Sequence, residues 1–227
     1  QLRKIGQKIR DIRRFNQILR ILTKHGFGFA IQQLHLEDHV IGRGIIKTRI
    51  LRRFTEPLES RAVRLRKVLE ELGPTFIKFG QILSVRPDLV PLDLCNELSK
   101  LQDHVPPFGY DDVRKQIKES FGKYPEELFA SFDPDPLAAA SLGQVHRAQL
   151  DMGENVVVKV QRPDIRKMIE TDLDILYTLA QLASRYMQDV KFFNPVGIVD
   201  EFSKVITKEI DFTYEAHTID KFCKNFK

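Results

Sequence analysis

Residues 133–136 read Asp-Pro-Asp-Pro, and this stretch constrains the fold more than any other part of the chain. Two prolines in four residues exclude both a helix and a central strand, because proline fixes φ and has no N–H to donate. Before this stretch, apolar residues recur at helical spacing, and after it strand-forming residues come first. The sequence therefore predicts an α+β chain with a boundary at 133–136.

A hairpin is predicted after the boundary, with strands over residues 145–150 and 156–160 and a Gly-containing turn between them. Lys159 stands in a run of valines, so its ammonium group either reaches water at a sheet edge or pairs with an acid in a cleft. Its surroundings fit the protein-kinase pattern Val-Ala-Ile-Lys, in which the lysine holds nucleotide phosphates. A match of only four residues is weak, and a lysine that lies by chance on an edge strand explains it equally well.

Two long helices are expected after the hairpin, over residues 164–187 and from 194 to about 224. The second carries Glu209, Asp211 and Glu215 in close succession. Such a cluster is either a solvated acidic face or part of a site.

The start of the chain is strongly basic. Residues 1–70 hold 17 Lys and Arg against 6 Asp and Glu, a net charge of +11, whereas the other residues have a net charge of −6. An amphipathic helix is predicted over residues 5–22, and its apolar stripe either lies on an anionic membrane surface or packs on the protein itself. Nucleic-acid binding is disfavoured because the basic residues lack interleaved aromatics. His35 and His39 do not have the order of a zinc-protease motif and are interpreted as surface residues.

Gly73-Pro74 separates two predicted helices, since glycine ends one and proline opens the next. In the second helix Lys78 and Gln81 fall on one side, and Phe76, Phe79 and Leu83 fall on the other. Gly80 in mid-helix indicates a close approach by some other group at this position. Taken alone, Lys78 is either solvated or functional.

Composition excludes several other classes of protein. The chain has two cysteines, Cys95 and Cys223, far apart in the sequence, which excludes a disulfide framework and a Cys-based zinc site and suits a reducing compartment. No apolar run approaches the ~20 residues of a spanning helix. The chain is thus not expected to cross a membrane by itself, and its start does not resemble a signal peptide.

Several motifs occur in one order along the chain. Leu72 to Gln81 is followed by Arg86-Pro-Asp-Leu, by Ala138 to His146, by Val158-Lys-Val-Gln-Arg-Pro163, and by the acidic cluster 209–215. Together they resemble the UbiB family of atypical, protein-kinase-like proteins that support ubiquinone and other prenyl-lipid biosynthesis. The resemblance covers roughly residues 60–227.

The resemblance implies a role for each motif. Lys78, Gly80 and Gln81 match the family's K-x-G-Q motif, on a helical extension folded over the site where a typical kinase admits a peptide. Ala138, Ala139, Ala140 and Ser141 match its alanine-rich loop, which replaces the glycine-rich phosphate-covering loop. Lys159 matches the phosphate-binding lysine and Glu215 the helix glutamate that pairs with it. Glu209 and Asp211 match the E-x-D motif, expected near the nucleotide's metal and the K-x-G-Q helix.

The implied fold is a helical N-terminal extension packed on a kinase-like small lobe. The organisation expected is a basic segment (1–60), an extension with K-x-G-Q (61–132) and a partial small lobe (133–227). The implied activity is Mg²⁺-dependent binding and hydrolysis of ATP, with ATP or ADP as ligand. Phosphorylation of other proteins is not expected, because the extension blocks access.

The implied partners are an anionic membrane surface and prenyl-lipid precursors or their biosynthetic enzymes. The expected location is peripheral, on the cytoplasmic side of a bacterial inner membrane or an organelle equivalent. The catalytic Asp, metal-binding Asn and Asp-Phe-Gly ligand of a second lobe are not in this sequence, so no complete metal site and no turnover by these residues alone are expected. The alternative is a non-catalytic, lipid-binding scaffold module.

Overall fold

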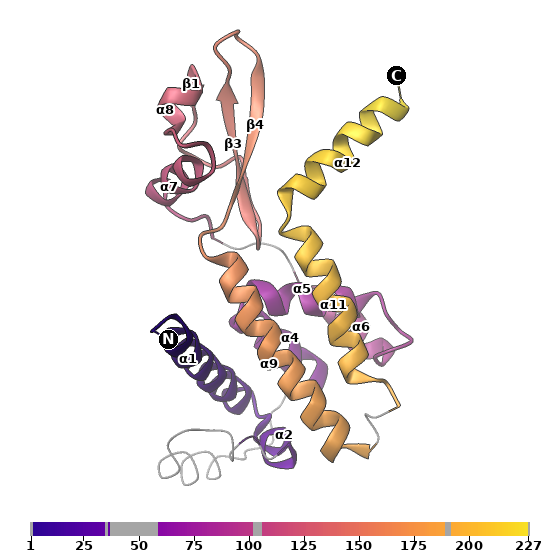
Figure 1. Cartoon of the computed structure of the whole chain (residues 1–227). Coiled ribbons are helices and arrows are strands. Elements are labelled where there is room, and N and C mark those ends of the chain that lie inside the picture. Colours follow the sequence, from indigo (N-terminus) through magenta and orange to yellow (C-terminus); the bar gives the residue numbers. More distant parts are fainter. Residues whose placement is uncertain (1, 35, 37–58, 102–105, 189–191, 227) are drawn as a thin grey trace. The chain divides into compact units, whose positions relative to one another are not determined.

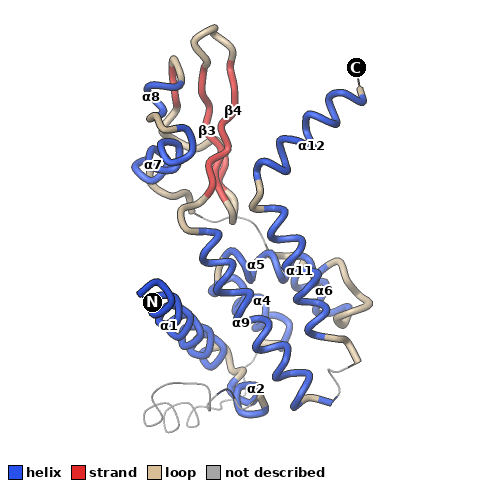
Figure 2. The backbone as a smooth tube through the Cα atoms, viewed as in Figure 1, coloured by secondary structure: helices blue, strands red, loops and turns tan. Residues whose placement is uncertain are grey.

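The computed structural model describes residues 2–34, 36, 59–101, 106–188 and 192–226, and it divides into two compact units. One unit is formed by residues 1–101 and 168–227 and the other by residues 102–167. Helices and a small antiparallel sheet are both present (Figures 1 and 2). The α+β prediction is therefore confirmed. The three-part division into 1–60, 61–132 and 133–227 stays a prediction.

The first unit is helical. Its helices are α1 (Leu2–Lys24), α2 (Gly28–Gln33), α4 (Arg61–Leu72), α5 (Pro74–Ser84), α6 (Leu92–Leu98), α9 (Ile165–Tyr186, whose first residues belong to the second unit), α11 (Pro195–Glu209) and α12 (Phe212–Asn225). Ser60 caps α4 by accepting from the Val63 N–H, and Pro74 opens α5 at its first turn. The sequence also predicts a helix from Pro57 through Glu71, but residue 57 lies outside the described residues, as do His35 and His39.

The described part of the α1 stripe packs on the protein itself. Ile18 and Leu19 are buried, and Leu19 lies in a cluster with Ile31 of α2 and Leu36. Leu179 and Leu182 of α9 pack against this cluster. The sequence left open whether this apolar stripe lies on a membrane or packs on the protein. The second half of α1 packs on the protein.

A buried ion pair holds α1 in place. Arg14 Nε lies 2.7 Å from Asp172 Oδ1 of α9, and an Arg14 terminal nitrogen also donates to the Leu72 carbonyl at 2.6 Å. The Asp172 side chain is fully buried. One guanidinium thus joins α1, α9 and the corner where α4 meets α5.

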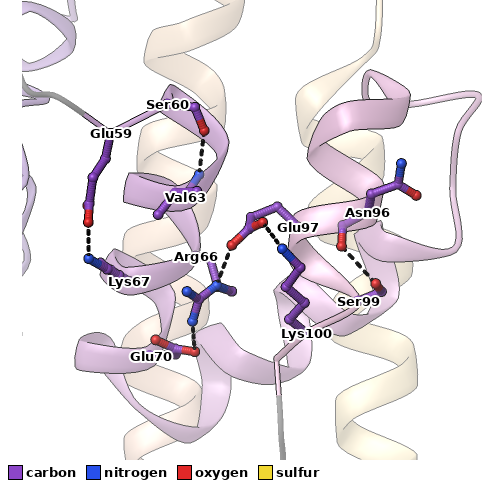
Figure 3. A network of polar contacts seen from close by, with 10 residues as sticks. All are labelled: Glu59, Ser60, Val63, Arg66, Lys67, Glu70, Asn96, Glu97, Ser99 and Lys100. Atoms are coloured by element: carbon purple, nitrogen blue, oxygen red, sulfur yellow. Dashed lines mark hydrogen bonds and ion pairs between the residues drawn. The ribbon is translucent and has the colours of Figure 1, made fainter.

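A second polar network joins α4 to α6 (Figure 3). Arg66 of α4 donates to Glu70 and, at 2.7 Å, to Glu97 of α6. Hydrogen bonds from Lys100 and then from Arg66 lower the pKa of Glu97. The network therefore holds α6, and Lys100 just after it, beside α4.

The second unit is built around a hairpin. Its helices are α7 (Tyr110–Phe121) and α8 (Pro125–Leu128), and its strands are β1 (Ser131–Phe132), β2 (Ala138–Ala139), β3 (Gly143–Gln149) and β4 (Asn155–Gln161). β4 pairs antiparallel along the whole of β3, while β1 and β2 pair with its two ends. The predicted hairpin is confirmed, and the prolines of 133–136 separate β1 from β2.

Two expected helices differ in the structure. The sequence predicts one short helix over residues 125–132, but in the structure these residues form the short α8 and then β1. The helix expected from 194 to 224 is two helices, because Asp211 is extended at φ −93°, ψ 90° and its carboxylate accepts from the first N–H groups of α12. A side chain that can cap a helix start competes with helix continuation.

Candidate functional site

The K-x-G-Q helix and the E-x-D segment meet inside the first unit. Lys78 of α5 places Nζ 2.6 Å from Oε1 of Glu209, the last residue of α11. The Lys78 side chain is 17% exposed and that of Glu209 is 37% exposed, so water screens this pair only in part. Two motifs far apart in the sequence thus share one ion pair.

The helices that carry this pair are held together in two further places. Phe79 packs edge-on against Phe202 of α11, with ring centroids 5.1 Å apart, and Phe202 is 1% exposed. Beyond the C-terminal end of α5, Arg86 bonds both oxygens of Asp88 and reaches Glu201 of α11 at 3.1 Å. Hydrogen bonds from Arg86 lower the pKa of Asp88. The Arg-Pro-Asp motif therefore fixes α11 beside α5 (Figure 1).

Gly80 and Gln81 both contact Leu101, which follows α6. A Cβ at Gly80 would lie 2.7 Å from Leu69 Cδ1 and closer still to Leu101 Cδ1, so any larger residue here would force these two leucine side chains to shift. Gln81 donates to the Leu101 carbonyl at 3.2 Å. In the structure these two motif residues therefore hold α5, the helix that carries Lys78, against Leu101.

Asp211 caps the start of α12, and Glu215 lies in the first turn of that helix. The Asp211 carboxylate accepts from the Thr213 and Tyr214 N–H groups at 3.0 and 3.2 Å. Glu215 is exposed in this first turn, where the helix dipole favours a negative charge. Asp211 thus has a capping role that the sequence interpretation did not include. Glu215 and Lys159 belong to different units, and their pairing stays a prediction.

The alanine-rich segment and Lys159 share one face of the sheet in the second unit. Ala138 lies opposite Val145 on one edge of β3, and Lys159 lies opposite Val145 on the other edge. Residues directly opposite in antiparallel strands project to the same side. Ala138, Val145 and Lys159 therefore form one row across three strands, and Lys159 is exposed on that face.

The segment after β2 makes a tight turn. The Ala140 N–H donates to the Gly143 carbonyl at 2.8 Å, and a Cβ on Gly143 would lie 2.5 Å from the Val160 carbonyl oxygen. Ser141 is 1% exposed, yet its Oγ has no hydrogen-bond partner among the described residues. A buried hydroxyl without a partner is costly. An acceptor such as a phosphate oxygen is the kind of group that this turn lacks, so these residues fit a nucleotide.

The opposite face of the sheet holds a buried polar pair to which the sequence analysis gave no role. Gln144 accepts from the Phe108 N–H at 2.9 Å, donates to the Phe108 carbonyl at 3.2 Å, and contacts His146 Nε2 at 2.9 Å. His146 Nδ1 lies 2.8 Å from the Asp133 carbonyl oxygen. Because Gln144 turns its amide nitrogen to the ring, His146 accepts at Nε2 and donates from Nδ1. The available signal was the alternation of polar residues 144 and 146 with Val145.

A cavity of about 460 Å³ lies between α7 and the start of α9. Cationic and acidic side chains both line it, and the predicted nucleotide-binding residues are not among its lining residues. Within the described ranges, no group of three or more His, Cys, Asp or Glu side chains is placed to hold a metal ion. Of the helices that the structure describes, none combines the length and apolar character needed to span a membrane.

Comparison with known proteins identifies the family. The family model described as ABC1 atypical kinase-like domain matches residues 100–227. Proteins named "Probable protein kinase UbiB" are similar: the one from Marinobacter nauticus is 47% identical over 77% of this chain and 32% of its own length. The one from Pseudomonas fluorescens Pf0-1 is 42% identical over 97% of this chain and 41% of its own length.

A solved structure of the Rv3197–erythromycin complex from Mycobacterium tuberculosis is 30% identical, with a TM-score of 0.41 over 67% of this chain and 38% of that one. The chain spans between about a third and two fifths of the length of the two curated relatives above. The model match covers more than half of the residues, and the motifs resembling UbiB lie mostly within it. The chain belongs to the UbiB proteins of the ABC1 atypical kinase-like family.

Proposed function

We propose that this chain forms part of a magnesium-nucleotide site in an atypical kinase-like ATPase that supports ubiquinone biosynthesis at a membrane. The observation that carries the proposal is the row Ala138–Val145–Lys159, which places the alanine-rich segment and the lysine on one face of the sheet. An ammonium group there can bind the phosphate oxygens of ATP or ADP, and the turn at 140–143 can cover them.

The metal would be held partly by the nucleotide's phosphates, as Mg²⁺ usually is in phosphoryl-transfer sites. Glu209 and Asp211 are the protein carboxylates that the family motif assigns to its neighbourhood. Glu209 bonds Lys78 and Asp211 caps α12 in the structure, so both carboxylates also hold structure in place. The bound metal supplies neutralisation of the charge that develops on the transferred phosphoryl group.

Replacing Lys159 with methionine tests the site. In a full-length UbiB protein carrying these residues, Lys159→Met is expected to weaken MgATP binding by at least about tenfold, because a charge-assisted contact to phosphate is lost. Titration calorimetry with MgATP and MgADP measures this. The matched control is Lys115→Met, which removes an exposed cation of α7 in the same unit. Equal affinity in the two variants would refute the nucleotide site.

A second candidate function is binding to an anionic membrane surface, and it rests on the exposed side of α1. Arg13, Arg20 and Lys24 are exposed, whereas Ile18 and Leu19 are buried. Because the apolar stripe packs inward, this part of α1 would associate by charge and not by insertion.

Vesicle co-sedimentation checks this proposal. The double variant R13Q/R20Q is expected to lower binding to vesicles containing phosphatidylglycerol about 30-fold at low salt, since each basic residue near an anionic surface contributes about 1 kcal/mol. Salt should reduce binding of the unmodified protein, because the charges are screened. The control K115Q/K167Q removes two exposed cations elsewhere. Loss of binding in the control to the same extent would exclude α1 as the specific surface.

A further inference from the structure

Arg162, in the Gln-Arg-Pro motif after β4, joins three parts of the second unit. Its Nε donates to the Ser141 carbonyl at 3.3 Å, and a terminal nitrogen donates to the Pro106 carbonyl at 3.0 Å. Its guanidinium lies over the Phe108 ring, 5.3 Å from the centroid. Its main-chain N–H donates to the Leu142 carbonyl at 2.9 Å. Main chain and side chain of one residue therefore hold the end of the alanine-rich segment.

The charge of Arg162 is held by carbonyl oxygens. Among the described residues, no carboxylate forms an ion pair with it, and burial lowers its pKa. A guanidinium suits this position because its planar fork can reach two carbonyls in different directions, which an ammonium group on a flexible stem does less well. The hydrogen bonds go to main-chain atoms, so they fix the backbone path and not a particular side chain.

The other side of this connection is itself fixed. Gln144 binds both the N–H and the carbonyl of Phe108, two residues after Pro106. The segment 106–108 is thus held from the sheet by Gln144 and from the end of β4 by Arg162. The Ser141 carbonyl is therefore linked, through the Arg162 guanidinium, to a segment that Gln144 also bonds to the sheet.

We propose that Arg162 is a positioning residue for the alanine-rich loop, which it holds by bracing the Ser141 carbonyl against the segment 106–108. This rests on the proposed function, in which residues 138–141 cover nucleotide phosphates. Alanines at 138–140 do not adopt positive φ as glycines do, so the loop's position depends on what holds its end. Loss of the brace lowers affinity for the nucleotide and leaves turnover of bound nucleotide nearly unchanged.

The test compares R162Q, R162K and the control R166Q in a full-length UbiB protein carrying these residues. Arg166 is exposed and, like Arg162, lines the cavity between α7 and the start of α9. Its loss therefore removes an equal charge nearby without removing a contact to residue 141. R162Q is expected to raise the KM for MgATP about tenfold with kcat changed less than about twofold, a loss of uniform binding. R162K, which keeps the charge but not the fork, is expected to fall between R162Q and the unmodified protein.

Hydrogen exchange gives a readout that does not depend on activity. In R162Q without nucleotide, the peptide containing residues 138–143 is expected to exchange faster than in R166Q, because its Ala140 to Gly143 hydrogen bond opens more often. Addition of MgADP is expected to slow exchange of both 138–143 and 106–109 in the unmodified protein, but only of 138–143 in R162Q.

The outcomes separate this inference from the proposed function. If K159M loses nucleotide affinity while R162Q matches R166Q in KM and in exchange, the brace is refuted and the site stands. If K159M keeps full affinity, the site itself is refuted. Should R162Q fail to fold, R162K decides, since full affinity in the folded R162K protein would overturn the role of the fork.

Discussion

Replacing Arg14 with methionine is expected to lower the free energy of unfolding of the helical unit by about 3–5 kcal/mol, because it leaves a buried carboxylate without its partner. The Asp172 side chain is fully buried and receives two hydrogen bonds from Arg14. The same change removes the donor to the Leu72 carbonyl. Urea-induced unfolding followed by circular dichroism measures the loss.

The control for Arg14 is Lys24→Met, on the same helix. Lys24 pairs with Glu71 at the surface, where its side chain is 63% exposed, so its loss is expected to cost no more than about 1 kcal/mol. A double variant R14M/D172L should recover much of the stability, since apolar residues of similar size often replace a buried ion pair without loss. If R14M were no more harmful than K24M, the ion pair would not be what holds α1 in place.

The second large effect is expected from Phe202→Ala, at about 3–5 kcal/mol of lost stability. Phe202 is 1% exposed and packs edge-on against Phe79, so its removal leaves a cavity between α11 and α5. Because Lys78 and Glu209 sit on these two helices, the ion pair between the motifs should loosen as well. Thermal unfolding measures the stability change.

The comparison variant for Phe202 is Phe29→Ala. Phe29 is 67% exposed on α2, so its loss is expected to change stability by no more than about 0.5 kcal/mol. A double-mutant cycle with Glu209→Gln and Lys78→Met, in the presence and absence of F202A, reports the coupling of the pair. A coupling unchanged by F202A would show that the aromatic contact does not position Lys78 and Glu209.

The elements that sequence reasoning located correctly have strong local signals. Pro74 at the start of α5 and the glycine-containing turn of the hairpin each fix a boundary by backbone chemistry alone. Residues 194–224 mislead because their apolar periodicity continues through 210–211. The capping by Asp211 that divides them depends on a side-chain choice that periodicity does not contain.

The candidate site could be predicted from the sequence only in part. Motif resemblance named Lys78 and Glu209, and the structure brings them together across elements far apart in sequence. The contacts of Gln144 and Arg162 with residues 106–108 could not be predicted, because they go to main-chain atoms of a segment without regular structure. Nothing in the identity of Pro106 or Phe108 indicates which side chain will bind its backbone.

Asp211 has a consequence for how relatives of this chain are compared. Its carboxylate starts α12 by accepting two N–H bonds, whatever else the motif does. The position before a helix favours side chains that accept such bonds, chiefly those of Asp, Asn, Ser and Thr. Invariance of this position among family members would therefore have a cause in chain geometry alone. A relative in which Asn replaces Asp here would keep the helix cap while losing the negative charge. Such natural variants would separate the capping role of residue 211 from the role of its charge.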